Sequence, residues 1–263
     1  MHPTRREFLG AAGATAVSLA LPLRVSGGEP KPKSHIVTLS FDDGFKNSSI
    51  KTAEIYEKHK LSACINVVAS AHRKDFRPPD YHDVPRGDFA LWNELRARGH
   101  EVMPHSFQHA NLQQFSFEEG KDLIRRCLDV FSRKLKGFEP KKAVYSFAYN
   151  ASTPKLEAWL PTQVMAFRTS GGAINPWPRR GQVKLTCTSF GPGNCEHAID
   201  REIDKLLAQQ SGWMIFNTHG LDDEGWGPIR AAYLDRLLER LVGVASVDVL
   251  PAGAALSKYV DQA

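Results

Sequence analysis

The sequence predicts an α/β fold built on a parallel sheet, either open or closed into a barrel. Short β-rich apolar segments alternate along the chain with amphipathic segments of helical length, as in sheets whose parallel strands are joined by helices. The 263 residues are enough for one domain with a sizeable core. Polar and titratable residues follow several predicted strands, at the sheet edge where such folds place their chemistry.

The predicted elements follow from hydrophobic periodicity and from the residues that bound each segment. The predicted strands cover 35–41, 63–68, 100–103, 143–147, 164–167, 183–185, 213–217 and 247–250. The predicted helices cover 48–59, 89–98, 116–135, 152–159, 195–210, 228–241 and 252–259. Ser116 and Glu119 are spaced as a capping box at the start of the longest helix. Ser152 is predicted to cap the helix that Pro154 opens.

The N-terminus is predicted to be an export signal that precedes the fold. Arg5 and Arg6 are followed by Phe-Leu and then by a weakly apolar run to about residue 23, which resembles a twin-arginine signal. That run is too short and too rich in Gly and Ala for a convincing transmembrane helix. The alternatives are an uncleaved N-terminal anchor or a chance Arg pair.

We therefore expect residues 1–26 to be the signal, 27–34 a linker and 35–263 the folded domain. The expected location is periplasmic or extracellular, with the twin-arginine export machinery as a transient partner and no stable membrane insertion after export.

The formal net charge is +5. Residues 1–26 carry Arg5, Arg6 and Arg24 against Glu7, which leaves about +3 for the rest of the chain. This excess is too small to indicate a nucleic-acid or membrane partner.

Four cysteines have two expected roles. Export permits disulfides, and Cys187 and Cys195 flank a turn-rich loop that a disulfide could close. The alternative is two unpaired thiols, and both interpretations stay open. Cys64 and Cys127 are predicted to be core residues in a strand and a helix.

Two pairs of residues suggest a metal site. His105 and His109 are four residues apart and can face the same way on a helical turn, although the spacing alone also fits a surface pair. Asp42 and Asp43 follow the first strand, where adjacent carboxylates are costly unless they bind a cation or act as a base. One Asp and two His suit zinc or another divalent ion, and the second Asp is then free to act as a base.

These residues lie in two recognisable motifs, Ser-Phe-Asp-Asp-Gly at 40–44 and Gly-His-Glu-Val-Met-Pro-His-Ser-Phe-Gln-His at 99–109. The chain, from about 36 to 259, resembles the NodB-type polysaccharide deacetylases, carbohydrate esterase family 4. The resemblance implies a distorted, partly open (β/α) barrel of about seven parallel strands. It also implies Asp42 as catalytic base, with Asp43, His105 and His109 holding one divalent ion. Zinc is the first candidate for that ion, with cobalt, nickel or manganese as alternatives.

Other family motifs match less closely. The segment Met-Ile-Phe-Asn-Thr-His-Gly at 214–220 is similar to the last motif and implies His219 as general acid. At 146–152 the chain lacks the Arg and Pro of the third motif, so the backbone N–H that stabilises the oxyanion belongs to Tyr149 in one alignment and to Ala151 in another. Arg168 either replaces the missing Arg beside the base or is a surface residue.

The motif that orients the acid has no clear match, and Asp222, Asp223 and Trp226 are only candidates for that role. Trp177 and Trp226 are either sugar-stacking residues at the rim or core residues.

The expected function is metal-dependent removal of N-acetyl groups from an extracytoplasmic polysaccharide or oligosaccharide, with a glycan as the partner molecule. One alternative is an amidase that acts on a non-sugar C–N bond. The other is a non-catalytic glycan-binding protein that keeps the metal, and the presence of Asp42 disfavours it because a binding protein needs no base.

Overall fold

A computed structural model describes residues 32–76 and 83–260 of the chain. The predicted export signal and the linker up to residue 31 lie outside the described residues. Among the residues described, no helix combines the length and the apolar character that a bilayer span requires.

The elements alternate as the sequence predicts, and most boundaries agree within three residues. The strands are β1 (His35–Phe41), β2 (Cys64–Val67), β3 (Glu101–Pro104), β4 (Val144–Ser146), β5 (Ala166–Ser170), β6 (Ile174–Asn175), β7 (Lys184–Cys187), β8 (Gly212–Thr218) and β9 (Val247–Val249). The α-helices are α1 (Lys46–Lys58), α2 (Phe89–Ala97), α3 (Phe117–Lys134), α4 (Pro154–Trp159), α5 (Cys195–Leu207), α6 (Ala231–Val242) and α7 (Ala252–Val260). Short 3-10 turns are η1 (Leu112–Gln114), η2 (Pro140–Lys142), η3 (Ala148–Asn150) and η4 (Leu160–Thr162).

The strands form two sheets that together make an incomplete barrel. The larger sheet has the order β3-β2-β1-β8-β6, with β9 also paired to β1, and the smaller sheet has the order β4-β5-β7. Every ladder is parallel except the one between β6 and β8. Within the described residues β3 and β4 share no ladder, so the barrel is open there. The predicted α/β fold with a partly open parallel barrel is confirmed.

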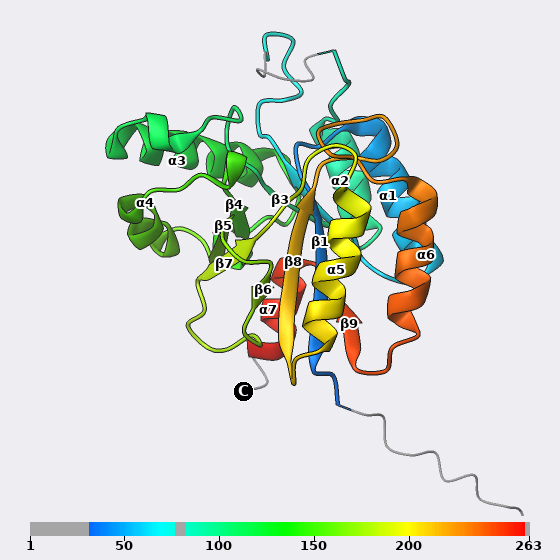
Figure 1. The fold of residues 1–263 in the computed structure, drawn as a ribbon. Helices are drawn as coiled ribbons and strands as arrows, with labels where there is room; N and C mark the ends of the chain where they lie inside the picture. Colours follow the sequence, from blue (N-terminus) through cyan, green and yellow to red (C-terminus); the bar gives the residue numbers. More distant parts are fainter. Residues whose placement is uncertain (1–31, 77–82, 261–263) are drawn as a thin grey trace, which may run out of the picture. The chain divides into compact units, whose positions relative to one another are not determined.

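The register of β1 and β8 determines where the site lies. These two strands pair along their whole length, from His35 opposite Gly212 to Phe41 opposite Thr218, and they run side by side through the centre of the fold (Figure 1). Both are buried throughout, as expected for parallel strands covered on both faces. Because their carboxyl ends coincide, the residues that follow them, Asp42 and His219, start from the same edge of the sheet.

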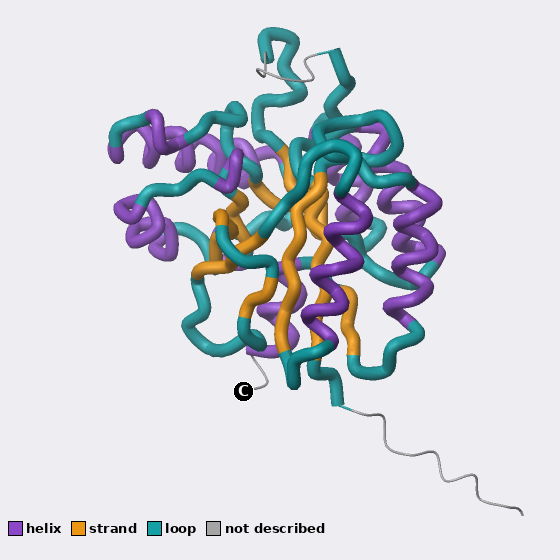
Figure 2. The backbone as a smooth tube through the Cα atoms, viewed as in Figure 1, coloured by secondary structure: helices purple, strands orange, loops and turns teal. Residues whose placement is uncertain are grey.

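Helices cover the larger sheet on both faces. α5 packs against β8, α6 packs against α1 and β9, and α7 packs against β1. Figure 2 shows the strands in the middle with helices along one side and the smaller sheet on the other. This cover removes the apolar faces of the strands from water and leaves the carboxyl edge for loops.

Two boundary details differ from the prediction. Thr153 caps α4 by accepting a hydrogen bond from the Leu156 N–H at 3.4 Å, whereas the hydroxyl of Ser152 bonds to Glu157 and contacts Thr169. Strand β6 was not predicted, because two residues carry no periodicity. The capping box of Ser116 and Glu119 is present at the start of α3.

All four cysteines are unpaired and buried. The thiol of Cys195 donates to the Phe190 carbonyl at 3.4 Å, while the thiol of Cys187 faces two asparagine side chains. Of the two interpretations of this pair, the structure has the unpaired thiols. Cys64 and Cys127 are core residues, as predicted.

Candidate metal centre and catalytic pocket

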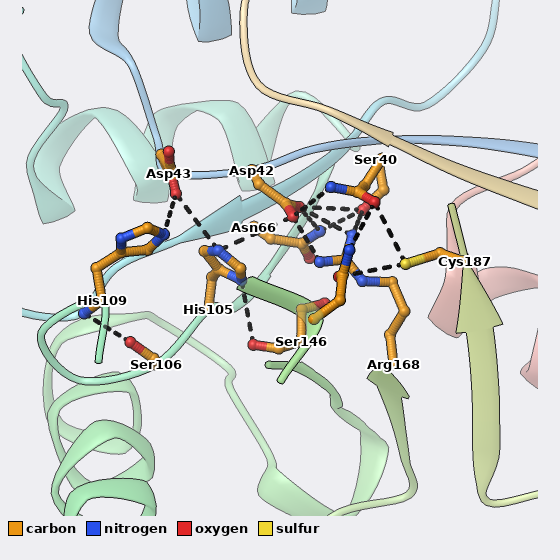
Figure 3. Close-up of polar contacts among 12 residues, drawn as sticks. Ser40, Asp42, Asp43, Asn66, His105, Ser106, His109, Ser146, Arg168 and Cys187 are labelled. Carbon is orange, nitrogen blue, oxygen red and sulfur yellow. Dashed lines mark hydrogen bonds and ion pairs between the residues drawn. The ribbon is translucent and has the colours of Figure 1, made fainter. Parts of the chain in front are cut away.

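The two aspartates turn away from each other at the end of β1. The Asp42 N–H donates to the Thr218 carbonyl at 2.9 Å, which continues the β1–β8 ladder. Asp43 then takes a left-handed backbone conformation with φ 73°, and Gly44 follows with φ 70°. This turn directs the Asp43 carboxylate toward two histidines, while the Asp42 carboxylate lies among Ser40, Asn66 and Arg168 (Figure 3). A side chain at position 44 would crowd Trp92 and Val67, so glycine is required there.

The two histidines come from the loop after β3, and they do not lie on a helical turn. Ser106 has φ 66° and His109 has φ 55°, both incompatible with a right-handed helix. The His109 N–H donates to the Ser106 hydroxyl at 2.7 Å, which closes the loop. The prediction of a helical turn was therefore wrong, although the loop brings the same two rings to one side.

The orientation of His105 is fixed by the smaller sheet. Its Nδ1 lies 3.1 Å from the Ser146 carbonyl at the end of β4. A carbonyl can only accept, so Nδ1 carries the proton and the Nε2 lone pair faces Asp43.

Asp43, His105 and His109 converge on one point. Asp43 Oδ1 lies 3.3 Å from His105 Nε2 and 3.1 Å from His109 Nε2, and one ligand atom from each residue lies within 4.8 Å of the others. Asp43 Oδ1 is nevertheless buried without a well-formed hydrogen bond. Burial would raise the pKa of Asp43, but the neighbouring His109 and His105 hold it well below its usual value. A buried oxygen and two imidazole nitrogens with no other hydrogen-bonding role fit a divalent cation.

Asp42 is held in a dense polar cluster on the other side. Its Oδ1 accepts from Asn66 Nδ2 at 2.9 Å, from the Arg168 guanidinium at 3.0 Å and from the Ser40 hydroxyl at 3.3 Å. Its Oδ2 accepts from the second Arg168 nitrogen at 2.5 Å. Burial would raise the pKa of Asp42, but Arg168 and His105 outweigh that effect and lower it.

Arg168 is 1% exposed and reaches Asp42 from β5. Its planar fork donates to both carboxylate oxygens, the geometry in which Arg pairs most strongly with a carboxylate. Burial would lower the pKa of Arg168, but the Asp42 charge raises it. The structure thus has Arg168 beside Asp42, and the alternative of a surface Arg is wrong.

His219 follows β8 and faces the same pocket. Its Nδ1 is buried and has no hydrogen-bond partner among the described residues. Burial lowers the pKa of His219, against the opposing effects of Asp43 and Asp42. The ring meets Trp226 edge to face, with centroids 5.4 Å apart.

The acidic residues suggested as partners of His219 have other roles or positions. Asp222 accepts from the Ala231 N–H at 2.9 Å, where α6 begins. Asp222 and Asp223 line a separate surface depression together with Glu224. Of the three candidates for orienting the acid, only Trp226 touches His219.

Tyr149 lies at the mouth of the pocket within η3. Its backbone has φ 56°, its side chain is 47% exposed, and its ring lies 4.6 Å from that of His109. The Ala151 N–H already donates to the Ala148 carbonyl at 3.0 Å. The Ala151 N–H is thus engaged within η3.

These side chains share one cavity of about 280 Å³. Its described lining residues are Asp42, Asp43, Arg86, His105, His109, Tyr149, Asn150, Ser189, Asn217, His219 and Trp226. Sequence reasoning missed Arg86, Asn150, Ser189 and Asn217. Two of them had a signal, since Asn217 lies two residues before His219 in the last motif and Asn150 follows Tyr149 in the segment aligned with the third motif.

Trp177 does not line this cavity. It packs on Tyr259 of α7, with ring centroids 4.5 Å apart, and belongs to a satellite apolar cluster. Trp177 was predicted to be either a rim residue or a core residue, and the structure has it packed against a core cluster.

Backbone strain gathers at the same place. Seven described non-glycine residues have positive φ, and five lie in the site loops: Asp43, Ser106, His109, Tyr149 and Asn150. Such conformations cost about 1–3 kcal/mol each and persist where the surrounding structure enforces them, often at functional sites.

The fold and the pocket define an α/β barrel protein with a candidate Asp-His-His metal centre next to a clamped carboxylate. The family model described as Polysaccharide deacetylase matches residues 29–159, which include Asp42, Asp43, His105 and His109. This part of the chain is therefore similar to the polysaccharide deacetylase family. Arg168, Asn217 and His219 lie beyond the matched segment.

Solved structures with the same fold cover most of the chain. A candidate polysaccharide deacetylase from Mycobacterium smegmatis has 13% identity and a TM-score of 0.65, and the match covers 89% of this chain and 93% of that one. A family 4 acetyl xylan esterase from Clostridium thermocellum, solved with a cobalt ion, has 17% identity and a TM-score of 0.57, covering 85% and 91%. The peptidoglycan deacetylase PdaC from Bacillus subtilis has 17% identity and a TM-score of 0.52, covering 89% and 95%. No relative is found among curated protein sequences.

Proposed function

We propose that the chain is a metal-dependent hydrolase that removes N-acetyl groups from an extracytoplasmic polysaccharide or oligosaccharide. The observation that carries the proposal is the juxtaposition of Asp42, Asp43, His105 and His109 in one pocket with His219. A non-catalytic binding protein has no need for a separately clamped carboxylate beside the metal ligands.

Asp43, His105 and His109 are proposed to hold one divalent ion. One carboxylate oxygen and two imidazole nitrogens are ligands that zinc commonly takes in proteins, and cobalt, nickel or manganese are alternatives. The cobalt ion in the similar esterase supports a transition metal here. Such an ion lowers the pKa of a water molecule and polarises the acyl carbonyl.

Asp42 is proposed to be the general base, acting through Oδ2. Three donors occupy Oδ1, whereas Oδ2 has a single short bond, to Arg168. Oδ2 also faces the metal side, 3.9 Å from His105 Nε2. The lowered pKa keeps the carboxylate ionised, so it can accept a proton from water as the water attacks the carbonyl carbon.

His219 is proposed to act on the departing amine, and Tyr149 on the carbonyl oxygen that becomes negatively charged during the reaction. His219 lines the same pocket and would donate a proton to the departing amine nitrogen. The backbone N–H of Tyr149 donates to the carbonyl oxygen as negative charge collects on it.

A glycan substrate is supported by the rim of the pocket. Tyr149 and Trp226 are 47% and 39% exposed, and exposed aromatic faces beside a polar cavity suit the apolar faces of sugar rings. The similar PdaC is named as a peptidoglycan deacetylase. The predicted twin-arginine signal would bring the enzyme to such glycans outside the cytoplasm.

Acetate release by the purified mature protein tests the proposal, together with metal analysis of the same preparation. Wild type, Asp42→Asn and His219→Ala are compared on peptidoglycan, chitooligosaccharides and small acyl amides. Acetate release from the glycans by wild type only is the expected result. Turnover confined to small non-sugar amides would indicate the amidase, and glycan affinity without any turnover would indicate a binding protein.

A further inference from the structure

A buried thiol lies behind the pocket wall, at the end of β7. Cys187 is 1% exposed and does not line the cavity, so it cannot touch a substrate there. Its Sγ lies 3.3 Å from Asn150 Oδ1 and 3.3 Å from Asn217 Oδ1. Both asparagines line the cavity, which places the thiol one residue away from the reacting groups.

The side-chain amide of Asn217 has a defined orientation. Its Oδ1 accepts from Asn150 Nδ2 at 3.1 Å. The Cys187 thiol has one proton to donate, and Asn217 Oδ1, Asn150 Oδ1 and the more distant Thr169 carbonyl are its possible acceptors. These donors orient the amide nitrogen the other way, toward Asp42 Oδ2 at 3.5 Å. The backbone is held too, because the Asn217 N–H donates to the Thr188 carbonyl at 3.0 Å, where the two sheets meet.

The length of the Asn217–Asp42 contact is informative. At 3.5 Å the amide is close enough to favour the carboxylate charge but too far for a strong hydrogen bond. A flipped amide would place its oxygen against Asp42 Oδ2, and an amide that moved closer would occupy the lone pair that must accept a proton. Donors on Asn217 Oδ1 prevent both changes.

We propose that Cys187, Asn150 and Asn217 form a positioning network that keeps Asp42 Oδ2 open and aimed toward the metal side. The inference rests on the proposed function, because it assigns Asp42 as the base. It adds a role for three residues outside the metal-binding motifs, and Cys187 acts entirely through Asn217 and Asn150.

Substitution of the thiol is the sharpest test, because Cys187 has no access to substrate. Cys187→Ala removes one donor, and kcat should fall about threefold to tenfold, with KM and metal content unchanged. Cys187→Ser keeps a donor of similar size and should restore most of the activity. Cys127→Ala is the matched control, since this thiol is also buried, in α3, and makes no hydrogen bond to a described residue. The control should lose stability without a change in kcat.

The network is disproved if Cys187→Ala changes kcat no more than Cys127→Ala, or if the serine variant is no better than alanine. A rise in KM alone would also contradict it, because positioning of the base affects the chemical step. A second measurement does not depend on turnover. Crystal structures of the zinc-loaded wild type and Cys187→Ala should show the Asn217 amide displaced toward Asp42 in the variant.

An Asn217 amide that stays in place in Cys187→Ala would overturn the network even if no substrate is found. Conversely, a wild type that hydrolyses no acetylated glycan would refute the proposed function, while the two crystal structures would still decide the network.

Discussion

The metal side and the base side of the pocket are built differently. Asp43, His105 and His109 come from two loops of the larger sheet, and all three lie within the segment that matches the family model. Asp42 starts from the same loop as Asp43, but its bracing crosses to the smaller sheet and to β8, through Arg168 and Asn217.

Under the proposed function, this difference separates metal binding from base chemistry. The turns that carry the metal ligands have local conformations with positive φ, and the His105 ring also contacts the Ser146 carbonyl of the smaller sheet. The orientation and charge of Asp42 depend instead on Arg168 from β5 and Asn217 from β8. Variants on the two sides should therefore fail in different ways, and the following predictions, from the largest effect to the smallest, test that separation.

The largest effect is expected from His105→Ala, on the metal side. Two ligands remain, too few for stable binding, so stoichiometric metal and activity should both disappear. Metal analysis of the purified variant by mass spectrometry provides the measurement. Unchanged metal content would mean that the three residues do not share an ion.

Asp42→Asn should abolish base catalysis without affecting metal binding. The amide cannot accept a proton at neutral pH, so turnover should fall by about 10²–10⁴, while the metal stays bound. Acetate release and metal content are measured on the same preparation. Loss of the metal here would show that the two carboxylates have exchanged roles.

Arg168→Met tests how far the base side depends on the smaller sheet. Removal of the guanidinium leaves a buried carboxylate without its main partner, at a cost of about 3–5 kcal/mol in the free energy of unfolding. Urea unfolding measures this cost. Arg168→Lys is the matched variant, and it should recover only part of the stability because Lys lacks the planar fork. Full recovery with Lys would mean that charge alone holds Asp42.

Trp226→Ala should have the smallest effect on activity, and it tests the rim of the pocket, outside both the metal side and the base side. Loss of stacking should raise KM for oligosaccharides by about twofold to tenfold and leave KM for a small acyl amide unchanged. Steady-state kinetics on both substrates provide the comparison. A fall in kcat on both would instead place Trp226 with His219, as the residue that orients its ring.

The metal side could be predicted from the sequence because its residues lie in short contiguous motifs after predictable strands. The predicted backbone conformation of the histidine segment was wrong. The four-residue spacing of His105 and His109 suggested a helical turn, but Ser106 and His109 adopt left-handed conformations that spacing does not encode.

The base side was harder, because its contacts are tertiary. Arg168 could be suggested only as one of two alternatives, since nothing local distinguishes a buried Arg from a surface one. Asn is common in turns and at strand ends, so the residue types of Asn150 and Asn217 gave no indication of a shared role. Their mutual contact depends on how the turn after β4 lies against the end of β8. The aromatic Trp177 was ambiguous for the same reason, since only packing on α7 separates rim from core.

The contacts that brace Asp42 also differ from the metal site in chain separation. Asp42 and Arg168 are 126 residues apart, and Asp42 and Asn217 are 175 residues apart. Closing such long loops costs conformational entropy and slows folding, and it requires strands from both sheets to be in place. As the chain folds, the loops after β1 and β3 can therefore bring Asp43, His105 and His109 together before Arg168 of β5 and Asn217 of β8 reach Asp42. Under the proposed function, the base would thus become competent later than the metal site.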